Sequence, residues 1–168
     1  MNKPQSNYAF IDGQNFYQSV RSIGVQNFDF RRFRVYLSKK HGVGIAYYFI
    51  GYITENKPLY SSLEAAGFEL VFKEVAKSYD KYKGNVDVNL TVKAMSEIDR
   101  YSKAVIVTSD GDYACLAEYL IEKNKLGCLI GCSRNGCSHL LRKLHVMTRI
   151  FYMDDIVRDL DMVVKRLL

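Results

Sequence analysis

Short apolar runs alternate along the chain with longer stretches in which apolar residues recur at helical spacing. The short runs predict strands at Tyr8–Ile11, Ile45–Tyr52, Glu69–Lys73, Ala104–Thr108, Leu126–Ile130 and Arg149–Phe151. The longer stretches predict helices at Arg31–Lys39, Leu59–Ala66, Val86–Arg100, Ala114–Lys123, His139–Leu144 and Asp154–Arg166. Because alternating strands and helices build right-handed βαβ units, we expect an α/β fold: a three-layer α/β/α sandwich with a mainly parallel, Rossmann-like central sheet.

Two of the predicted strands are apolar on both faces, as is typical of a parallel sheet with helices on both sides. Tyr8–Ile11 runs into Asp12, and Ala104–Thr108 runs into Ser109 and Asp110. Such sheets bind ligands beyond the carboxyl ends of their strands, at the point where the strand order reverses. If the first and fourth strands are neighbours, these acids emerge side by side at one crevice.

The length and composition fit one domain. The chain has 168 residues, of which 48% are hydrophobic and 25% charged, as in ordinary globular proteins with a core of their own. It has only two prolines, and no repeat or linker is visible. We therefore expect a single domain over residues 1–168, with a core at about 8–156 and a C-terminal helix at 154–166.

No segment of the sequence resembles a membrane span or a leader. The longest near-apolar run, Ile45–Ile53, is too short to cross a bilayer, and the run at the amino terminus stops at Asp12. We expect a cytoplasmic protein with no membrane partner and with reduced cysteines. Cys128, Cys132, Cys137 and His139 lie close together in sequence, but without a Cys-x-x-Cys pair they favour buried or spectator thiols over a zinc site.

The net charge of +6 comes from 24 basic and 18 acidic side chains. If four aspartates surround metal cations, the rest of the protein carries 24 − (18 − 4) = +10. An excess of this size suits a polyanion, although a basic surface that binds nothing accounts for the charge equally well. The expected partner is RNA, with single-stranded DNA as the alternative, and a homo-oligomer is compatible with the sequence.

Asp12-Gly13-Gln14-Asn15 follows the first predicted strand. The glycine allows a sharp turn, after which Asp12 and Asn15 can both point into the crevice. An aspartate or asparagine after a strand also commonly caps the next helix, and for this motif alone capping is the stronger interpretation.

Thr108-Ser109-Asp110-Gly111-Asp112-Tyr113 follows the fourth predicted strand and begins a helix. One acid suffices as a cap, and a second in the first turn gains only about 0.3–1 kcal/mol from the helix dipole. Capping therefore accounts for one aspartate better than for the pair. A shared cation relieves the repulsion between close carboxylates.

Asp87 lies at the start of the long central helix, so three acidic segments are predicted at one rim of the sheet. Four carboxylates there would be costly without a cation, and Mg²⁺ or Mn²⁺ prefers such oxygen ligands. A metal at this rim can activate water and neutralise charge on a phosphodiester. His41, His139 and His145 are more typical of solvated or structural histidines than of a catalytic base.

Two other segments are candidates for nucleic-acid contact. Lys77, Lys81, Tyr82 and Lys83 precede Asp87, and lysines interleaved with tyrosines can pair with phosphates and stack on unpaired bases. A solvated loop explains this segment equally well by itself. After the fifth predicted strand, Arg134 beside Ser133 could hold a phosphate.

The three acidic motifs, in this order and spacing, resemble the NYN domain family. Asp12-Gly-Gln-Asn15, Gly84-Asn-Val-Asp87-Val and Ser109-Asp-Gly-Asp112-Tyr are similar to its bacterial LabA-like branch, within the PIN-like nuclease superfamily, over about residues 8–156. The resemblance implies a PIN-like fold, bound Mg²⁺ or Mn²⁺ and metal-dependent endoribonuclease activity. Carried over residue by residue, it implies catalytic metal ligands at Asp12, Asp87, Asp110 and Asp112 and supporting roles for Asn15 and Ser109. Ser133 and Arg134, our candidates for nucleic-acid contact, lie where members of this family often have polar residues.

The sequence departs from the family pattern at two positions. Many relatives carry a further acid where this chain has Lys93, which favours an alternative function as an RNA-binding or scaffolding module with a degenerate site. Tyr113 stands where phenylalanine is usual, a change that we expect to be harmless. A phosphatase of the haloacid dehalogenase type is disfavoured because Gln14 occupies the position of its second acid.

Overall fold

A computed structural model describes residues 6–25, 27–73, 76–78, 81–83 and 87–165 of the protein, with the backbone alone for 76–78, 81–83 and 161–165. Six strands form one all-parallel sheet in the order β3-β2-β1-β6-β7-β8. Their bounds are β1 Asn7–Asp12, β2 Val43–Gly51, β3 Glu69–Lys73, β6 Ala104–Val107, β7 Leu126–Gly131 and β8 Ile150–Tyr152. Each corresponds to a predicted strand, and the expected α/β fold is confirmed.

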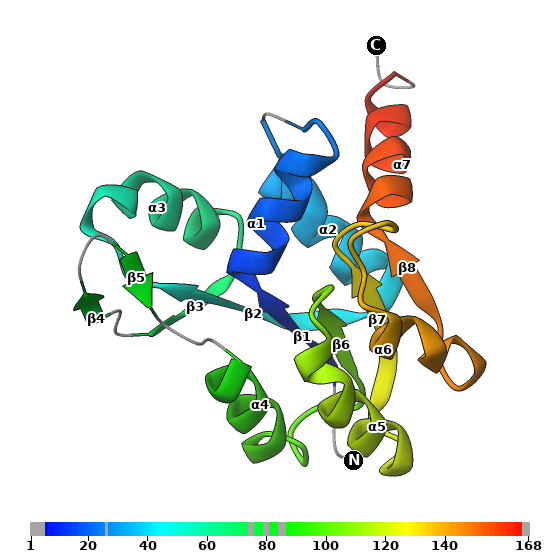
Figure 1. The fold of residues 1–168 in the computed structure, drawn as a ribbon. Coiled ribbons are helices and arrows are strands. Elements are labelled where there is room, and N and C mark those ends of the chain that lie inside the picture. Colours follow the sequence, from blue (N-terminus) through cyan, green and yellow to red (C-terminus); the bar gives the residue numbers. More distant parts are fainter. Residues whose placement is uncertain (1–5, 26, 74–75, 79–80, 84–86, 166–168) are drawn as a thin grey trace, which may run out of the picture.

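Helices cover both faces of this sheet (Figure 1), which makes the predicted three layers. One face carries α1 Gly13–Ser22, α2 Phe30–His41, α3 Lys57–Ala65 and α7 Met153–Lys165. The other carries α4 Asp87–Ser96, α5 Ala114–Glu122 and α6 His139–Arg142, followed by the short 3-10 helix η3 Lys143–Val146. Two further 3-10 turns, η1 Thr54–Asn56 and η2 Gly111–Tyr113, lead into α3 and α5.

Alternate residues of the central strands fill two separate cores. Phe10 of β1 and Ile106 of β6 belong to the core under α4 and α5, while Ile11 and Val107 belong to the core under α1 and α2. All four side chains are fully buried. Because successive strand residues point to opposite faces, a strand apolar at every position is what a doubly covered sheet requires.

The strand order reverses between β1 and β6. From β1 the chain continues outward through β2 to β3, and from β6 it continues outward on the other side through β7 to β8. Phe10 pairs with Ile106 and Ile11 with Val107, so β1 and β6 end at the same level. The expected pairing of the first and fourth predicted strands is confirmed, and their acidic ends lie at the switch point.

The structure contains elements that the apolar pattern did not predict. Helix α1 buries only Gly13, Phe16 and Val20 among polar neighbours, too narrow an apolar stripe to stand out in the sequence. β4 Ala76–Ser78 and β5 Lys81–Lys83 form a short antiparallel pair where we considered a loop. Strands of three residues rich in lysine give no alternating apolar signal.

Helix α4 is shorter than predicted. It ends at Ser96 rather than at Arg100, and the chain turns there so that the buried hydroxyl of Tyr101 donates to the Ala94 carbonyl at 2.8 Å. The last residue of the predicted C-terminal helix, Arg166, lies outside the described residues. In the part of the chain that the structure describes, none of the helices combines the length and apolar character needed to cross a membrane.

Candidate metal centre

Three aspartates gather at the carboxyl rim of the sheet. Asp87 is the first residue of α4, and Asp110 and Asp112 lie in the turn after β6. Each offers a carboxylate oxygen, and these oxygens all lie within 4.8 Å of one another. Asp87 and Asp110 are half-buried and Asp112 is exposed, so the cluster is open to solvent on one side.

Asp12 lies beside this cluster but is not a member of it. It ends β1 and caps α1, where its Oδ1 accepts a hydrogen bond from the Asn15 amide at 3.1 Å. The Thr108 hydroxyl donates to its Oδ2 at 3.4 Å. Only 5% of Asp12 is exposed. Of the four aspartates that we predicted to bind metal, three therefore cluster and the fourth, Asp12, is buried next to them; metal binding by all four stays a prediction.

The surroundings of Asp12 disfavour its charge. Burial above all, together with the nearby carboxylates of Asp87 and Asp110, raises its pKa from 3.8 to about 6 in spite of the hydrogen bonds from Asn15 and Thr108. Nearby negative charge and loss of water both destabilise a carboxylate. The rim thus concentrates negative charge that a cation would relieve.

Two residues that we did not predict to belong to the site hold the acids in place. Thr108 Oγ1 accepts a hydrogen bond from the Asp110 amide at 3.1 Å, in addition to its contact with Asp12. It therefore joins the ends of β1 and β6. Its position immediately before Ser109-Asp110 was the available signal, and a threonine at a strand end is too common to be read alone.

Tyr113 is the second such residue. Its hydroxyl donates to Asp87 Oδ1 at 2.9 Å, which orients one of the clustered carboxylates. Burial, followed by the charges of Asp12 and Asp87, raises the pKa of Tyr113, so the phenol keeps its proton. We expected tyrosine in place of phenylalanine to be harmless, and the hydroxyl instead has a defined partner.

Asn15 and Ser109 connect the same two strand ends. Asn15 Oδ1 accepts from the Ser109 amide at 2.8 Å. The Ser109 hydroxyl oxygen accepts from the amides of Cys132 at 2.8 Å and Ser133 at 3.4 Å, which ties in the end of β7. In turn, Ser133 Oγ accepts from the Gly136 amide at 3.0 Å. Asn15, Ser109 and Ser133 thus contact backbone groups around the acids, and Ser133 is itself buried.

The turn after β1 depends on glycine at position 13. A Cβ there would lie 2.3 Å from the Tyr48 ring and 2.6 Å from the Phe49 carbonyl oxygen, and the latter is backbone that cannot easily move. Phe49 is also the residue of β2 that pairs with Asp12. The close approach of Gly13 to β2 therefore fixes where α1 begins and where Asp12 lies.

Arg134 has partners away from the acidic cluster. Its guanidinium bonds Asp155 at 2.5 Å and lies 4.4 Å above the ring of Tyr152, and its amide donates to Asp154. Phosphate contact by Arg134 stays a prediction that requires it to exchange Asp155 for the ligand. The side chains of Lys77, Lys81, Tyr82 and Lys83, which we also predicted to contact nucleic acid, lie outside the described residues.

Lys93 does not point a free charge at the rim. Its ammonium lies 2.6 Å from Glu97 and 4.7 Å from the centre of the Tyr47 ring. Burial of Glu97 opposes its charge, but the hydrogen bonds from Lys93 and Tyr47 outweigh burial, and the pKa of Glu97 is lowered. The lysine that replaces the expected acid is thus held by Glu97, just after α4, and by Tyr47 of β2.

The cysteines and histidines do not form a zinc site in the described part of the chain, where the three aspartates are the one group of three or more potential ligands this close together. Cys128, Cys132 and Cys137 are buried and Cys115 is exposed, all as free thiols. His41 ends α2 and contacts Tyr36 and Cys128, a structural position. His139 and His145 are exposed.

The chemistry of the donor set fits Mg²⁺ or Mn²⁺. Both are hard cations that prefer carboxylate oxygens, and magnesium usually keeps several waters while binding one or two carboxylates. Asp87, Asp110 and Asp112 supply the oxygens, and the exposed side at Asp112 leaves room for water. No sulfur or imidazole ligand accompanies them within the described residues.

Comparisons with known proteins agree with this fold. The chain has the fold of a crystal structure of a protein of unknown function from Vibrio parahaemolyticus, with a TM-score of 0.77 over 92% of this chain and 97% of that one. At 22% identity, this likeness concerns the fold alone. A search of the curated proteins finds no match to the sequence. The all-parallel sheet between helical layers is consistent with a PIN-like, Rossmann-like fold. The sequence pattern of the NYN domain matches residues 8–145, and the chain belongs to the NYN domain family.

Proposed function

We propose that this protein is a metal-dependent endoribonuclease of the LabA-like branch of NYN domains. The observation that carries the proposal is the convergence of Asp87, Asp110 and Asp112 within 4.8 Å at the switch point of the sheet. Its support from the family is general, since NYN domains belong to a nuclease superfamily. That the substrate is RNA is part of our proposal and does not follow from the family alone.

In this proposal the three clustered aspartates hold Mg²⁺ or Mn²⁺. The bound cation would supply Lewis-acid activation of water and neutralise charge that develops on the scissile phosphate. Tyr113 keeps Asp87 oriented through its hydrogen bond, and Thr108 holds the Asp110 turn. Groups that fix ligands in this way commonly matter for metal affinity almost as much as the ligands do.

Asp12 adds negative charge beside the cluster without belonging to it. Its Oδ1 is engaged by Asn15 and its Oδ2 faces Thr108, so it is held rigidly against the turn after β6. A cation above it would favour its ionised form, and Asp12 would then strengthen cation binding in return. We therefore assign Asp12 to the catalytic set as a charge partner of the cluster, and Asn15 and Ser109 as its supports.

A polyanionic substrate fits the charge of the protein. The net charge is +6 although the proposed centre is acidic, so the basic excess lies elsewhere on the molecule. We propose RNA over single-stranded DNA, with contacts from Arg134 and from Lys77, Lys81, Tyr82 and Lys83. The free thiols of all four cysteines agree with a cytoplasmic setting, which we also propose.

Cleavage of a labelled RNA in the presence and absence of Mn²⁺ tests this function. We expect cleavage that EDTA abolishes and that Asp110→Asn or Asp12→Asn eliminates, with the fold unchanged by circular dichroism. Asp159→Asn, which removes an exposed carboxylate from α7, is the matched control and should cleave normally. Persistent cleavage by both site variants after metal removal would contradict the proposal.

Lys93 favours a second candidate function, that of an RNA-binding or scaffolding module with a degenerate site. Lys93 lies two turns along α4, where the resemblance leads us to expect an acid, and it forms an ion pair with Glu97 just after the helix. A gel-shift assay with the same RNA separates the two functions. Retarded but uncut RNA in the presence of Mn²⁺ would favour the binding module.

A further inference from the structure

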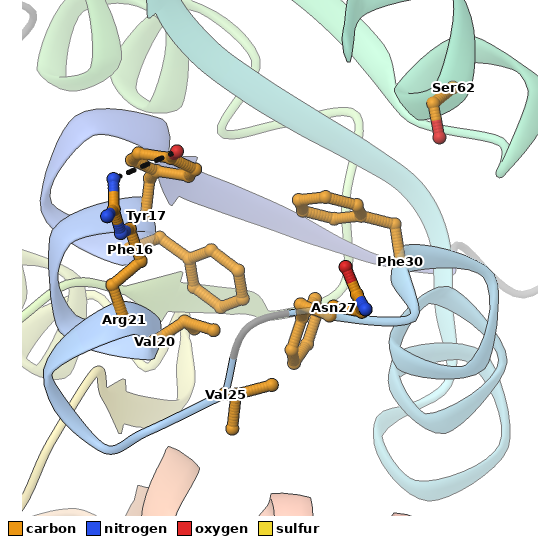
Figure 2. A pocket seen from close by; sticks show the side chains of 9 residues that line it. Phe16, Tyr17, Val20, Arg21, Val25, Asn27, Phe30 and Ser62 are labelled. Carbon is orange, nitrogen blue, oxygen red and sulfur yellow. Dashed lines mark hydrogen bonds between the residues drawn. The ribbon is translucent and has the colours of Figure 1, made fainter.

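A pocket of about 630 Å³ lies between α1, the segment that joins α1 to α2, and α3. Figure 2 shows Phe16 and Tyr17 of α1 on one side of it and Phe30 and Asn27 on the other. Pockets of about 300–1,000 Å³ are the size that takes small organic ligands. The contacts already assigned to the acidic cluster involve none of these four side chains.

The walls of the pocket are largely aromatic. Phe28 packs edge-to-face against both Phe16 and Phe30, with ring centres 5.2 Å apart in each pair. Phe16 is only 1% exposed, whereas Tyr17 at the mouth is 48% exposed. A fixed aromatic floor with an accessible ring at the edge suits a planar, heteroaromatic ligand, which gains from stacking and edge contacts.

Polar groups at the mouth restrict the ligand further. Arg21 donates a hydrogen bond to the Tyr17 hydroxyl at 3.5 Å, and its guanidinium lies 5.7 Å from the centre of the Tyr17 ring (Figure 2). Among the described side chains, no carboxylate forms an ion pair with Arg21. An exposed guanidinium without a carboxylate partner can bind phosphate. The Asn27 amide can both donate to and accept from the edge of a base.

Helix α1 connects the pocket to the residues that lie beside the acidic cluster. Asp12 caps this helix, Asn15 bonds the Ser109 amide, and Phe16 and Tyr17 follow immediately. Phe16 lies four residues after Asp12, which is about 6 Å along the helix axis. A short stretch of one nucleic-acid strand is long enough to contact both.

We propose that this pocket binds a nucleobase that carries a phosphate, with the base among Phe16, Tyr17, Phe28 and Phe30, its edge at Asn27, and the phosphate at Arg21. Two sources have this chemistry: an unpaired base of a bound strand, and a free nucleotide. We assign the pocket to an unpaired base next to the cleavage position, and that assignment rests on the proposed function. The binding of a base and a phosphate in this pocket does not depend on the proposed function.

Binding to the metal-free protein tests the proposal without any cleavage. In EDTA, adenosine 5′-monophosphate is titrated by calorimetry, and a short fluorescein-labelled single-stranded RNA is titrated by anisotropy. We expect Tyr17→Ala and Arg21→Gln each to weaken both ligands about tenfold, as for the loss of one stacked base. Tyr17→Phe keeps the ring and should bind almost normally, and Arg149→Gln removes an exposed arginine elsewhere as the charge control.

The two sources give different results in competition. Displacement of the RNA by adenosine 5′-monophosphate supports the strand-binding pocket. Tight nucleotide binding that both variants weaken, with RNA affinity unchanged, supports the pocket chemistry but assigns it to a free nucleotide. Unchanged affinity of both ligands in Tyr17→Ala and Arg21→Gln, or no binding to the parent protein, overturns the proposal. Because EDTA is present throughout, failure of the nuclease proposal would leave this result readable.

Discussion

Asp12 ends β1 and Asp110 lies in the turn after the neighbouring β6, and each caps the helical turn that follows it, yet their carboxylates lie in different surroundings. Asp12 is 5% exposed and bonded to Asn15 and Thr108. Asp110 is half-buried, accepts from the Asp112 amide at 3.0 Å, and shares an open rim with Asp87 and Asp112. Local sequence is similar at the two turns, so the packing beyond each turn makes the difference.

The packing differs because the two helices start differently. After Asp12, α1 begins at once, with Gly13 pressed against β2, and the carboxylate is covered. After Asp110, a 3-10 turn precedes α5, and its acidic residue Asp112 stays exposed. One turn therefore buries a carboxylate whose charge is disfavoured, and the other presents carboxylates to a cation and its waters. Two aspartates that cap helical turns in the same way can therefore differ in how available they are to a metal.

The largest expected effect is on metal affinity, at the open turn. Asp110→Asn should weaken Mn²⁺ binding, measured by calorimetry, on the order of 100-fold or more, because it removes a charged oxygen ligand and exceeds the 10–100-fold effect of losing a partner of a ligand. Asp12→Asn should weaken it less, since Asp12 lies outside the three-residue cluster. Equal losses in the two variants would erase the distinction between the turns.

The next effect is smaller and is a gain rather than a loss: replacing Asp12 at the buried turn should stabilise the protein. In EDTA near pH 8, Asp12→Asn should raise the free energy of unfolding by about 2–3 kcal/mol, because it removes a carboxylate whose pKa is raised from 3.8 to about 6. Asparagine keeps an oxygen that can accept from the Asn15 amide. Urea denaturation measures the change.

The stability gained by Asp12→Asn should depend on pH. A carboxyl group with a raised pKa in the folded state favours folding while it is protonated, and that contribution is lost as the pH rises through about 6. The advantage of Asp12→Asn should therefore shrink as the pH falls towards 4. A gain in stability that is constant from pH 4 to pH 8 would show that charge at Asp12 is not its cause.

The smallest expected effect concerns the orientation of Asp87. Tyr113→Phe removes only the hydroxyl that donates to Asp87, and it should weaken Mn²⁺ binding about tenfold while the ring continues to fill the core. Tyr47→Phe, which removes a hydroxyl bonded to Glu97, is the control and should leave metal affinity unchanged. If Tyr113→Phe binds Mn²⁺ with the affinity of the parent protein, the hydroxyl has no role in metal binding, as we first expected.

Strong apolar periodicity made most of the fold predictable. β1 and β6 are apolar at consecutive positions, and this pattern led to a doubly covered parallel sheet and to the pairing of the two strands. Helix α1 was missed because Phe16 and Val20 are nearly all of its buried surface. The pair of β4 and β5 was missed because pairing between backbones leaves no apolar trace in short, basic strands.

Those parts of the candidate site whose position depends on the strand order could be predicted from the sequence. The parts that depend on side-chain packing were harder to predict. The rule that ligands bind at the carboxyl ends of strands located Asp12, Asp87 and Asp110 on one rim. The separation of Asp12 from the cluster depends on how deeply α1 packs, which spacing along the chain does not encode. The hydroxyl of Tyr113 reaches Asp87 across 26 positions, a contact that only the folded chain defines.

The hydrogen bonds across the β1–β6 seam have a consequence for when such a centre can exist. Thr108 meets Asp12 across 96 positions, and Ser109 meets Asn15 across 94. A chain still emerging from the ribosome holds Asp12 long before its counterparts have been synthesised. If the protein cuts RNA, its own messenger is therefore safe from the growing chain until most of the domain has been made.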